Sequence, residues 1–233
     1  MANRCDEADE ASELLADIES MVMDRATSSA WIVMTDGTAV RGPLEPSPFS
    51  PTSAIIRTRY VPSFNRLFME TNRGDTIETE LPTLKSPAPR GGRPVVYLDQ
   101  RDWNLLAQVL YEPERVRTEW ERDAAAHLIA LARARKIILP MSFAHLGETS
   151  KWSVTDKRYH LALTLTQLSQ GWQMRYPIDV WQHELHETFA SRLQQVTLPP
   201  LDVFTLEGCA IESKVTFQKP AISSAGFPRG LST

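Results

Sequence analysis

The sequence predicts an α/β fold with a parallel sheet, preceded by a small β-rich, barrel-like module. Two continuous apolar runs, at residues 95–98 and 136–139, have the pattern of strands that are buried on both faces. Helical periodicity between and after them predicts parallel pairing with a right-handed helical crossover. A stretch rich in proline and glycine at residues 86–94 predicts a linker. We therefore expect a β-rich module over residues 1–85 and an α/β domain over residues 95–233.

The composition is that of an ordinary globular protein. The chain has 233 residues, of which 42% are hydrophobic, and a net charge of −4. No run approaches the roughly 20 apolar residues that span a bilayer, and the first residues lack the basic and apolar segments of a signal peptide. Cys5 and Cys209 do not have the pattern of a disulfide framework or a zinc site. These features predict a cytoplasmic protein that does not act at a membrane.

Within the N-terminal module, the sequence predicts one helix and several short strands. Apolar residues at helical spacing in an acidic segment predict an amphipathic helix over residues 6–24. Short apolar runs over residues 30–84, with a hairpin signal at Asp36-Gly37, predict four or five strands in a curled sheet or small barrel. The module carries no catalytic motif, so we expect an accessory role with a protein as its candidate partner.

Five helices are predicted after the linker. One begins near Asp102, and the others cover about residues 114–135, 143–151, 157–169 and 177–193. The buried face of the second is predicted from apolar residues at helical spacing, namely Val116, Trp120, Ala124, Leu128 and Leu131. The buried face of the last is predicted in the same way from Ile178, Trp181, Leu185, Phe189 and Leu193. His183 and Glu187 point away from this stripe, so they are expected to be solvated. His183 and His186 lack the four-residue spacing of zinc proteases, so a protease motif is not indicated.

Asp99 and Glu148 are the candidate catalytic residues and metal ligands. Asp99 directly follows the first predicted strand, and Glu148 lies on the helix that follows the second. Ligands bind outside the carboxyl ends of strands in open parallel sheets, so both carboxylates are expected at one edge of the sheet. Mg²⁺ and Mn²⁺ prefer such oxygen ligands and keep several waters. The alternative for Asp99 is a cap of the following helix.

Other polar residues are candidates for supporting roles. His145 lies about one turn before Glu148 and is interpreted either as a proton-transfer or phosphate-binding group or as a buried, hydrogen-bonded histidine. Lys151 can share the same helix face. Arg133 and Arg135 belong to a basic stretch that can guide an RNA backbone, although a solvated helix face explains these charges equally well.

The segments around both carboxylates resemble the PIN-like family. Residues 95–100 with Trp103 look like the start of PIN-like domains, in which a buried strand ends in Leu-Asp before a polar residue and a helix. Glu148 stands where the second acid of that family stands. The resemblance covers about residues 95–195. It implies a Mg²⁺- or Mn²⁺-dependent ribonuclease, in a family whose members often act as toxins or in RNA processing.

The sequence departs from the family pattern at two points. Arg101 follows Gln100, where asparagine is common. PIN-like proteins use three or four clustered acids, and the later acids are not identified by a motif here; the candidates are Asp179, Glu184, Asp202 and Glu207. The alternative function is therefore an inactive PIN-like scaffold that binds a partner.

Overall fold

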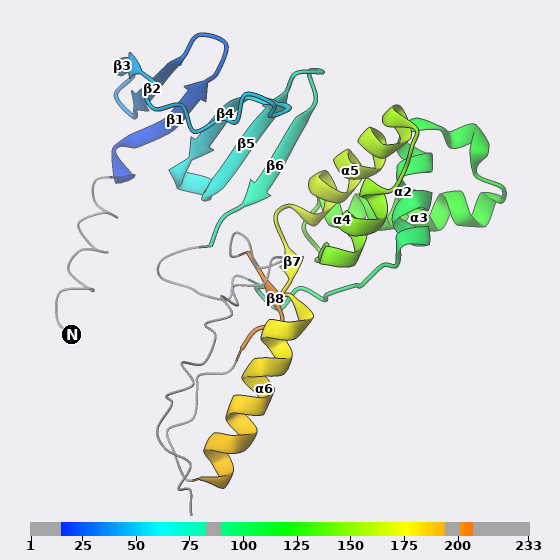
Figure 1. The fold of residues 1–233 in the computed structure, drawn as a ribbon. Coiled ribbons are helices and arrows are strands. Elements are labelled where there is room, and N and C mark those ends of the chain that lie inside the picture. Colours follow the sequence, from blue (N-terminus) through cyan, green and yellow to red (C-terminus); the bar gives the residue numbers. More distant parts are fainter. Residues whose placement is uncertain (1–14, 83–89, 194–200, 207–233) are drawn as a thin grey trace, which may run out of the picture.

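The computed structural model describes residues 15–82, 90–193 and 201–206. Its N-terminal part is a six-stranded antiparallel sheet with the strand order β3-β2-β1-β4-β5-β6. The strands are β1 (Ile18–Asp24), β2 (Ser29–Met34), β3 (Ala39–Pro43), β4 (Ile55–Val61), β5 (Arg66–Thr71) and β6 (Thr76–Glu80). The sheet is open, with β3 and β6 at its edges, so it is curled but is not a closed barrel (Figure 1).

The predicted β structure over residues 30–84 is confirmed as far as β6, but the predicted helix over residues 6–24 is wrong from residue 18 on, although residues 15 and 16 are helical. Residues 18–24 form β1, which pairs with β2 on one side and β4 on the other. Cross-strand pairing on both sides therefore overrides the local helical spacing of the apolar residues. The first part of the predicted helix lies outside the described residues. Asp36-Gly37 forms the turn between β2 and β3, where Gly37 has a φ of 85° that suits glycine.

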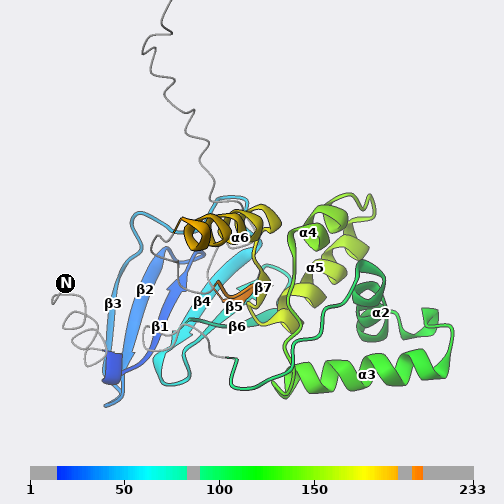
Figure 2. The same ribbon diagram turned by 90° about the horizontal axis from the view of Figure 1, so that it is seen from below.

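Helices follow the sheet. They are α2 (Gln100–Tyr111), α3 (Glu119–Arg133), α4 (Phe143–Ser150), α5 (Thr155–Ser169) and α6 (Pro177–Arg192), with 3-10 turns η1 (Pro62–Phe64) and η2 (Pro113–Arg115). Two short strands, β7 (Gln173–Met174) and β8 (Phe204–Thr205), pair antiparallel. Both ribbon views place the sheet on one side of the molecule and α2–α5 on the other (Figure 1, Figure 2). None of the helices in the described ranges is long and apolar enough to cross a membrane.

The prediction of a parallel-sheet, PIN-like α/β domain is wrong. The two segments expected to be parallel strands share a single parallel bridge, between Val95 and Ile138, while the extended sheet is antiparallel and lies in the N-terminal part. Two features limit the parallel pairing. Pro94 and Pro140 bound the two segments, and proline has no N–H for a ladder. The carbonyl of Leu98 accepts a hydrogen bond from a histidine side chain and not from a neighbouring strand.

The expected burial of these segments on both faces is nevertheless confirmed at residues 137–139. Ile137 and Leu139 belong to a core that joins α2, α3 and α5, whereas Ile138 belongs to a second cluster with Trp172 and Leu206. Alternate side chains therefore point into two different cores, as in a strand. Both clusters lie outside the six-stranded sheet, so the described residues concentrate their apolar core in the helical part.

The predicted face of α3 is right in part. Val116 is buried, and Leu128 and Leu131 pack half-buried against the core. Trp120 is 70% exposed, however, and the fully buried residues of the helix are Ala125, Ile129 and Ala132. The true stripe is therefore displaced by about one position from the predicted one, which is a small rotation on a helix of 3.6 residues per turn.

The error is larger in α6. Its apolar stripe is exposed, and the large side chains of that stripe are Ile178, Trp181, Leu185, Phe189 and Leu193. Ala190 is the buried residue of this helix, and His183 and Glu187 are half-buried where they were expected to be solvated. Because α6 extends away from α2–α5 (Figure 1), these helices do not cover its stripe.

Polar contacts join the sheet to the helical part. The guanidinium of Arg93 donates two hydrogen bonds to the Glu80 carboxylate, with N···O distances of 2.8 and 2.9 Å. The amide of Glu80 donates to the carbonyl of Gln170 at 2.8 Å, and the Tyr159 hydroxyl donates to Asp75 at 2.5 Å. The segment at 83–89 lies outside the described residues, so the linker and the division into two domains stay predictions.

Candidate functional site

Asp99 caps α2. Its backbone is extended and its Oδ1 accepts a hydrogen bond from the amide of Asp102 at 2.9 Å. This confirms the structural alternative for the residue, because an N-cap carboxylate satisfies a free amide in the first turn. Capping uses only one carboxylate oxygen, and Asp99 is exposed. The cap therefore fixes the position of a carboxylate that still faces solvent.

His145 fastens the start of α4 to the residue that precedes Asp99. The amide of Ser142 donates to Nδ1 of His145 at 3.0 Å, and Nε2 lies 2.9 Å from the carbonyl of Leu98. Since Nδ1 accepts a hydrogen bond, Nε2 carries the ring proton and donates a hydrogen bond to the carbonyl of Leu98. The ring is 2% exposed and stacks on Tyr97. The interpretation of His145 as a buried, hydrogen-bonded histidine is confirmed.

The pKa of His145 is set by burial and by nearby groups. Burial lowers the pKa of His145, whereas its hydrogen bond to Leu98 and the negative charges of Glu148 and Asp99 raise it. His145 therefore lies within electrostatic range of both candidate carboxylates. Among the described residues, however, Asp99, His145 and Glu148 are not grouped to hold a metal ion.

A second contact joins the same two helices. Nε2 of Gln100 donates to Oγ1 of Thr149 at 3.1 Å, so the residues that follow Asp99 and Glu148 in sequence touch. Oε1 of Gln100 is buried and has no hydrogen-bond partner among the described residues. A buried acceptor without a donor costs free energy, and it supplies an oxygen for a ligand or a water. Sequence reasoning missed this role, although Gln100 is part of the segment that resembles the PIN-like family.

The further candidate acids do not join this pair. Asp202 accepts hydrogen bonds from the Arg90 guanidinium, one at 3.1 Å, and from the amide of Phe204. Asp179 lies in the first turn of α6. Glu184 is exposed on the same helix, and Glu207 lies outside the described residues. Over the described ranges, no three His, Cys, Asp or Glu side chains are grouped to hold a metal ion.

The candidate substrate-binding cations are dispersed. Arg135 forms ion pairs with Glu78 and Glu80 of β6, so its side chain joins the sheet to the helical part. Arg133 is exposed in the last turn of α3, and Lys151 is exposed at the end of α4. A basic surface made by these three residues is therefore not formed, because Arg135 is neutralised by carboxylates.

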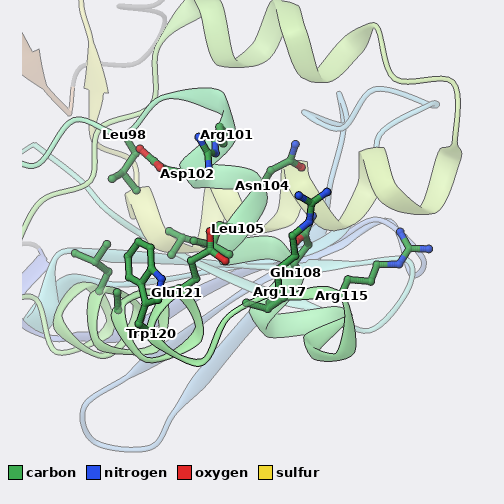
Figure 3. Close-up of a pocket in the computed structure, with 15 residues that line it drawn as sticks. Leu98, Arg101, Asp102, Asn104, Leu105, Gln108, Arg115, Arg117, Trp120 and Glu121 are labelled. Atoms are coloured by element: carbon green, nitrogen blue, oxygen red, sulfur yellow. The ribbon is translucent and has the colours of Figure 1, made fainter.

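A groove of about 800 Å³ runs between α2 and α3. Figure 3 shows Leu98, Arg101 and Asp102 toward one end of the lining and Arg115 and Arg117 toward another. Leu98 precedes Asp99, so this groove begins next to the N-cap of α2, although Asp99 and Glu148 do not line it.

Comparison of the chain with protein-family models, with curated proteins and with solved structures found no match.

Proposed function

We propose that the chain is a Mg²⁺- or Mn²⁺-dependent nuclease that hydrolyses phosphodiester bonds, with Asp99 and Glu148 as its metal ligands. The observation that supports this proposal is the fastening of α4, which carries Glu148, to the residue before Asp99 through His145. Two carboxylates that converge on one site repel one another, and a divalent cation relieves that repulsion.

The donor set fits a hard cation. Mg²⁺ binds through one or two carboxylates, completes its shell with waters and substrate phosphates, and does not need an all-protein cage. Asp99 and Glu148 provide the two carboxylates, and the unpartnered Oε1 of Gln100 is an amide oxygen of the kind that binds hard cations or accepts from their waters. Cysteine and histidine ligands, which softer metals prefer, are not grouped within the described residues.

Each residue then has a defined part in hydrolysis. A bound divalent cation lowers the pKa of water and offsets negative charge on the leaving oxygen. Asp99 and Glu148 would hold the cation, so that a phosphodiester bound to it would be oriented for hydrolysis. Gln100 would accept a hydrogen bond from the attacking water and orient it. His145 positions Glu148 and does not transfer protons, because both of its nitrogens are already engaged.

RNA is proposed as the substrate because the segments around Asp99 and Glu148 resemble PIN-like ribonucleases. The proposed location of the protein is the cytoplasm. The resemblance is applied only to the chemistry of this site, since the parallel sheet expected with it is not formed.

A second candidate is a protein that binds RNA or a protein partner without cleaving. One observation favours it: within the described residues no third acid joins Asp99 and Glu148. In that case the N-terminal sheet is the candidate surface for a protein partner.

The test is Mn²⁺-dependent cleavage of labelled single-stranded RNA by the parent protein, Asp99→Asn and Glu148→Gln. We expect each variant to lose about a hundredfold or more in rate, since metal charge stabilisation contributes several kcal/mol. Asparagine is itself a good N-cap, so Asp99→Asn preserves α2. The matched control is Glu184→Gln, an exposed acid on α6, which should cleave like the parent. A parent inert with both Mg²⁺ and Mn²⁺ would leave the binding function as the better description.

A further inference from the structure

The α2–α3 groove has a polar wall along α2. Arg101, Asn104 and Gln108 line it at positions i, i+3 and i+7, so they share one helix face. Figure 3 shows these side chains directed to the same side of α2. The wall carries one cation and two amides, which can each donate and accept hydrogen bonds.

Two arginines in the groove, Arg101 and Arg117, are exposed and form no ion pair among the described residues. The third, Arg115, pairs with Glu112 at 2.8 Å. Of the acids in the lining, Glu121 accepts a hydrogen bond from the Thr118 hydroxyl at 2.8 Å in the first turn of α3. The groove therefore contains two free guanidinium groups, which bind phosphate groups well.

Trp120 lies on the opposite wall of the groove and does not belong to the buried core of α3. Its side chain is 70% exposed, and the core side of α3 is made by Ala125, Ile129 and Ala132. An exposed indole beside free arginines is a stacking surface for a planar group, since nucleic-acid bases stack on aromatic rings.

We propose that the α2–α3 groove binds a single-stranded nucleic acid, with an unpaired base stacked on Trp120 and backbone phosphates held by Arg101 and Arg117. The choice of this occupant rests on the proposed function, because the groove begins at Leu98, next to Asp99. A strand lying in the groove leads to the metal ligands. In a duplex the base faces are already stacked, so the groove selects unpaired strands.

The experiment measures fluorescence anisotropy of labelled RNA and DNA oligonucleotides of about ten unpaired nucleotides, in EDTA so that no cleavage occurs. Trp120→Ala should weaken binding roughly five- to hundredfold, as expected for loss of one base–aromatic stack, and Trp120→Phe should restore most of it. Arg117→Gln should reduce the slope of log affinity against log salt by about one. The matched control is Trp181→Ala, an indole 58% exposed on α6, which should bind like the parent.

Equal binding by parent and Trp120→Ala, or tighter binding of the matching duplex than of the single strand, would overturn the inference. Binding of RNA in preference to DNA, or of both alike, supports it. A failure of the groove inference can be distinguished from a failure of the nuclease proposal. A parent that binds through Trp120 but never cleaves with Mn²⁺ rejects only the nuclease, and a parent that cleaves while Trp120→Ala binds unchanged rejects only the groove.

Discussion

Helices α5 and α6 are of nearly equal length, 15 and 16 residues, but differ in what they bury. In α5 six residues are buried, among them Leu161, Leu165 and Leu168, whereas in α6 only Ala190 is buried. The regular spacing of large apolar residues is clearer in α6. Periodicity therefore identifies an apolar face, but its burial depends on whether the chain folds back over it. α5 lies among α2, α3, α4 and β6, and α6 leaves that group.

The same contrast separates the candidate acids. Glu148 stands on α4, which is tied to the start of α2 by His145 and by the Gln100–Thr149 contact. Asp179 and Glu184 stand on α6, which has no such tie to α2 among the hydrogen bonds of the described residues. A carboxylate can contribute to a site only where packing fixes its position, so Glu148 on the anchored helix is a stronger candidate ligand than the acids of the projecting helix.

The largest expected effect tests the packing contrast with one substitution on each helix. Leu165→Ala removes a fully buried side chain of α5 and should lower the free energy of unfolding by about 2–5 kcal/mol. Leu185→Ala removes a side chain of α6 that is 36% exposed and should lower it by only about 1 kcal/mol or less. Denaturant-induced unfolding measures both. A loss above about 2 kcal/mol for Leu185→Ala would show that a partner or another part of the chain covers the α6 stripe.

A smaller effect concerns the pH dependence of stability. Burial lowers the pKa of His145 below its ordinary value of 6.5, so the unfolded chain takes up the proton more readily than the folded one. The contribution of neutral His145 to the free energy of unfolding is complete above pH 6.5, and it is lost as the pH falls below that value toward the pKa of His145 in the folded protein. His145→Gln should therefore be less stable at neutral pH and show a flatter decline on acidification.

His186→Gln is the control for this pH effect, because His186 is exposed on α6. Its stability profile should follow that of the parent, as measured by denaturant unfolding at a series of pH values. If His145→Gln keeps the parent's slope of unfolding free energy against pH below pH 6.5, groups other than His145 cause the pH dependence.

The sequence predicted local features better than pairing. Asp36-Gly37 correctly indicated a hairpin, because turn chemistry is local. Residues 18–24 were misassigned since their apolar spacing fits a helix, and only β2 and β4 on either side make them a central strand. The apolar run at 136–139 gave the correct burial at residues 137–139, whereas Tyr97 in the run at 95–98 is 52% exposed. Proline and the Leu98–His145 bond limit the parallel pairing of the two runs.

The site was predictable in part for the same reason. Asp99 follows a buried segment and caps α2, and Glu148 lies on α4, which follows the buried residues 137–139, so the placement of each acid at the start of or within a helix follows from local sequence. Gln100 was not identified as a site residue because its unpartnered oxygen depends on the contact with Thr149. The groove was missed because Trp120 was expected in the core. The face of α3 that packs on the core is displaced by about one residue position from the predicted face, so the side chain of Trp120 is exposed.

The most direct test asks whether Asp99 and Glu148 share one cation. Isothermal titration of Mn²⁺ into the parent protein, Asp99→Asn, Glu148→Gln and the control Glu184→Gln needs neither substrate nor turnover. We predict one binding event in the parent and in Glu184→Gln, and a loss of about tenfold or more in affinity for each of the other two variants. A parent that binds no Mn²⁺, or Asp99→Asn and Glu148→Gln variants that bind it as tightly as the parent, would contradict the shared metal site.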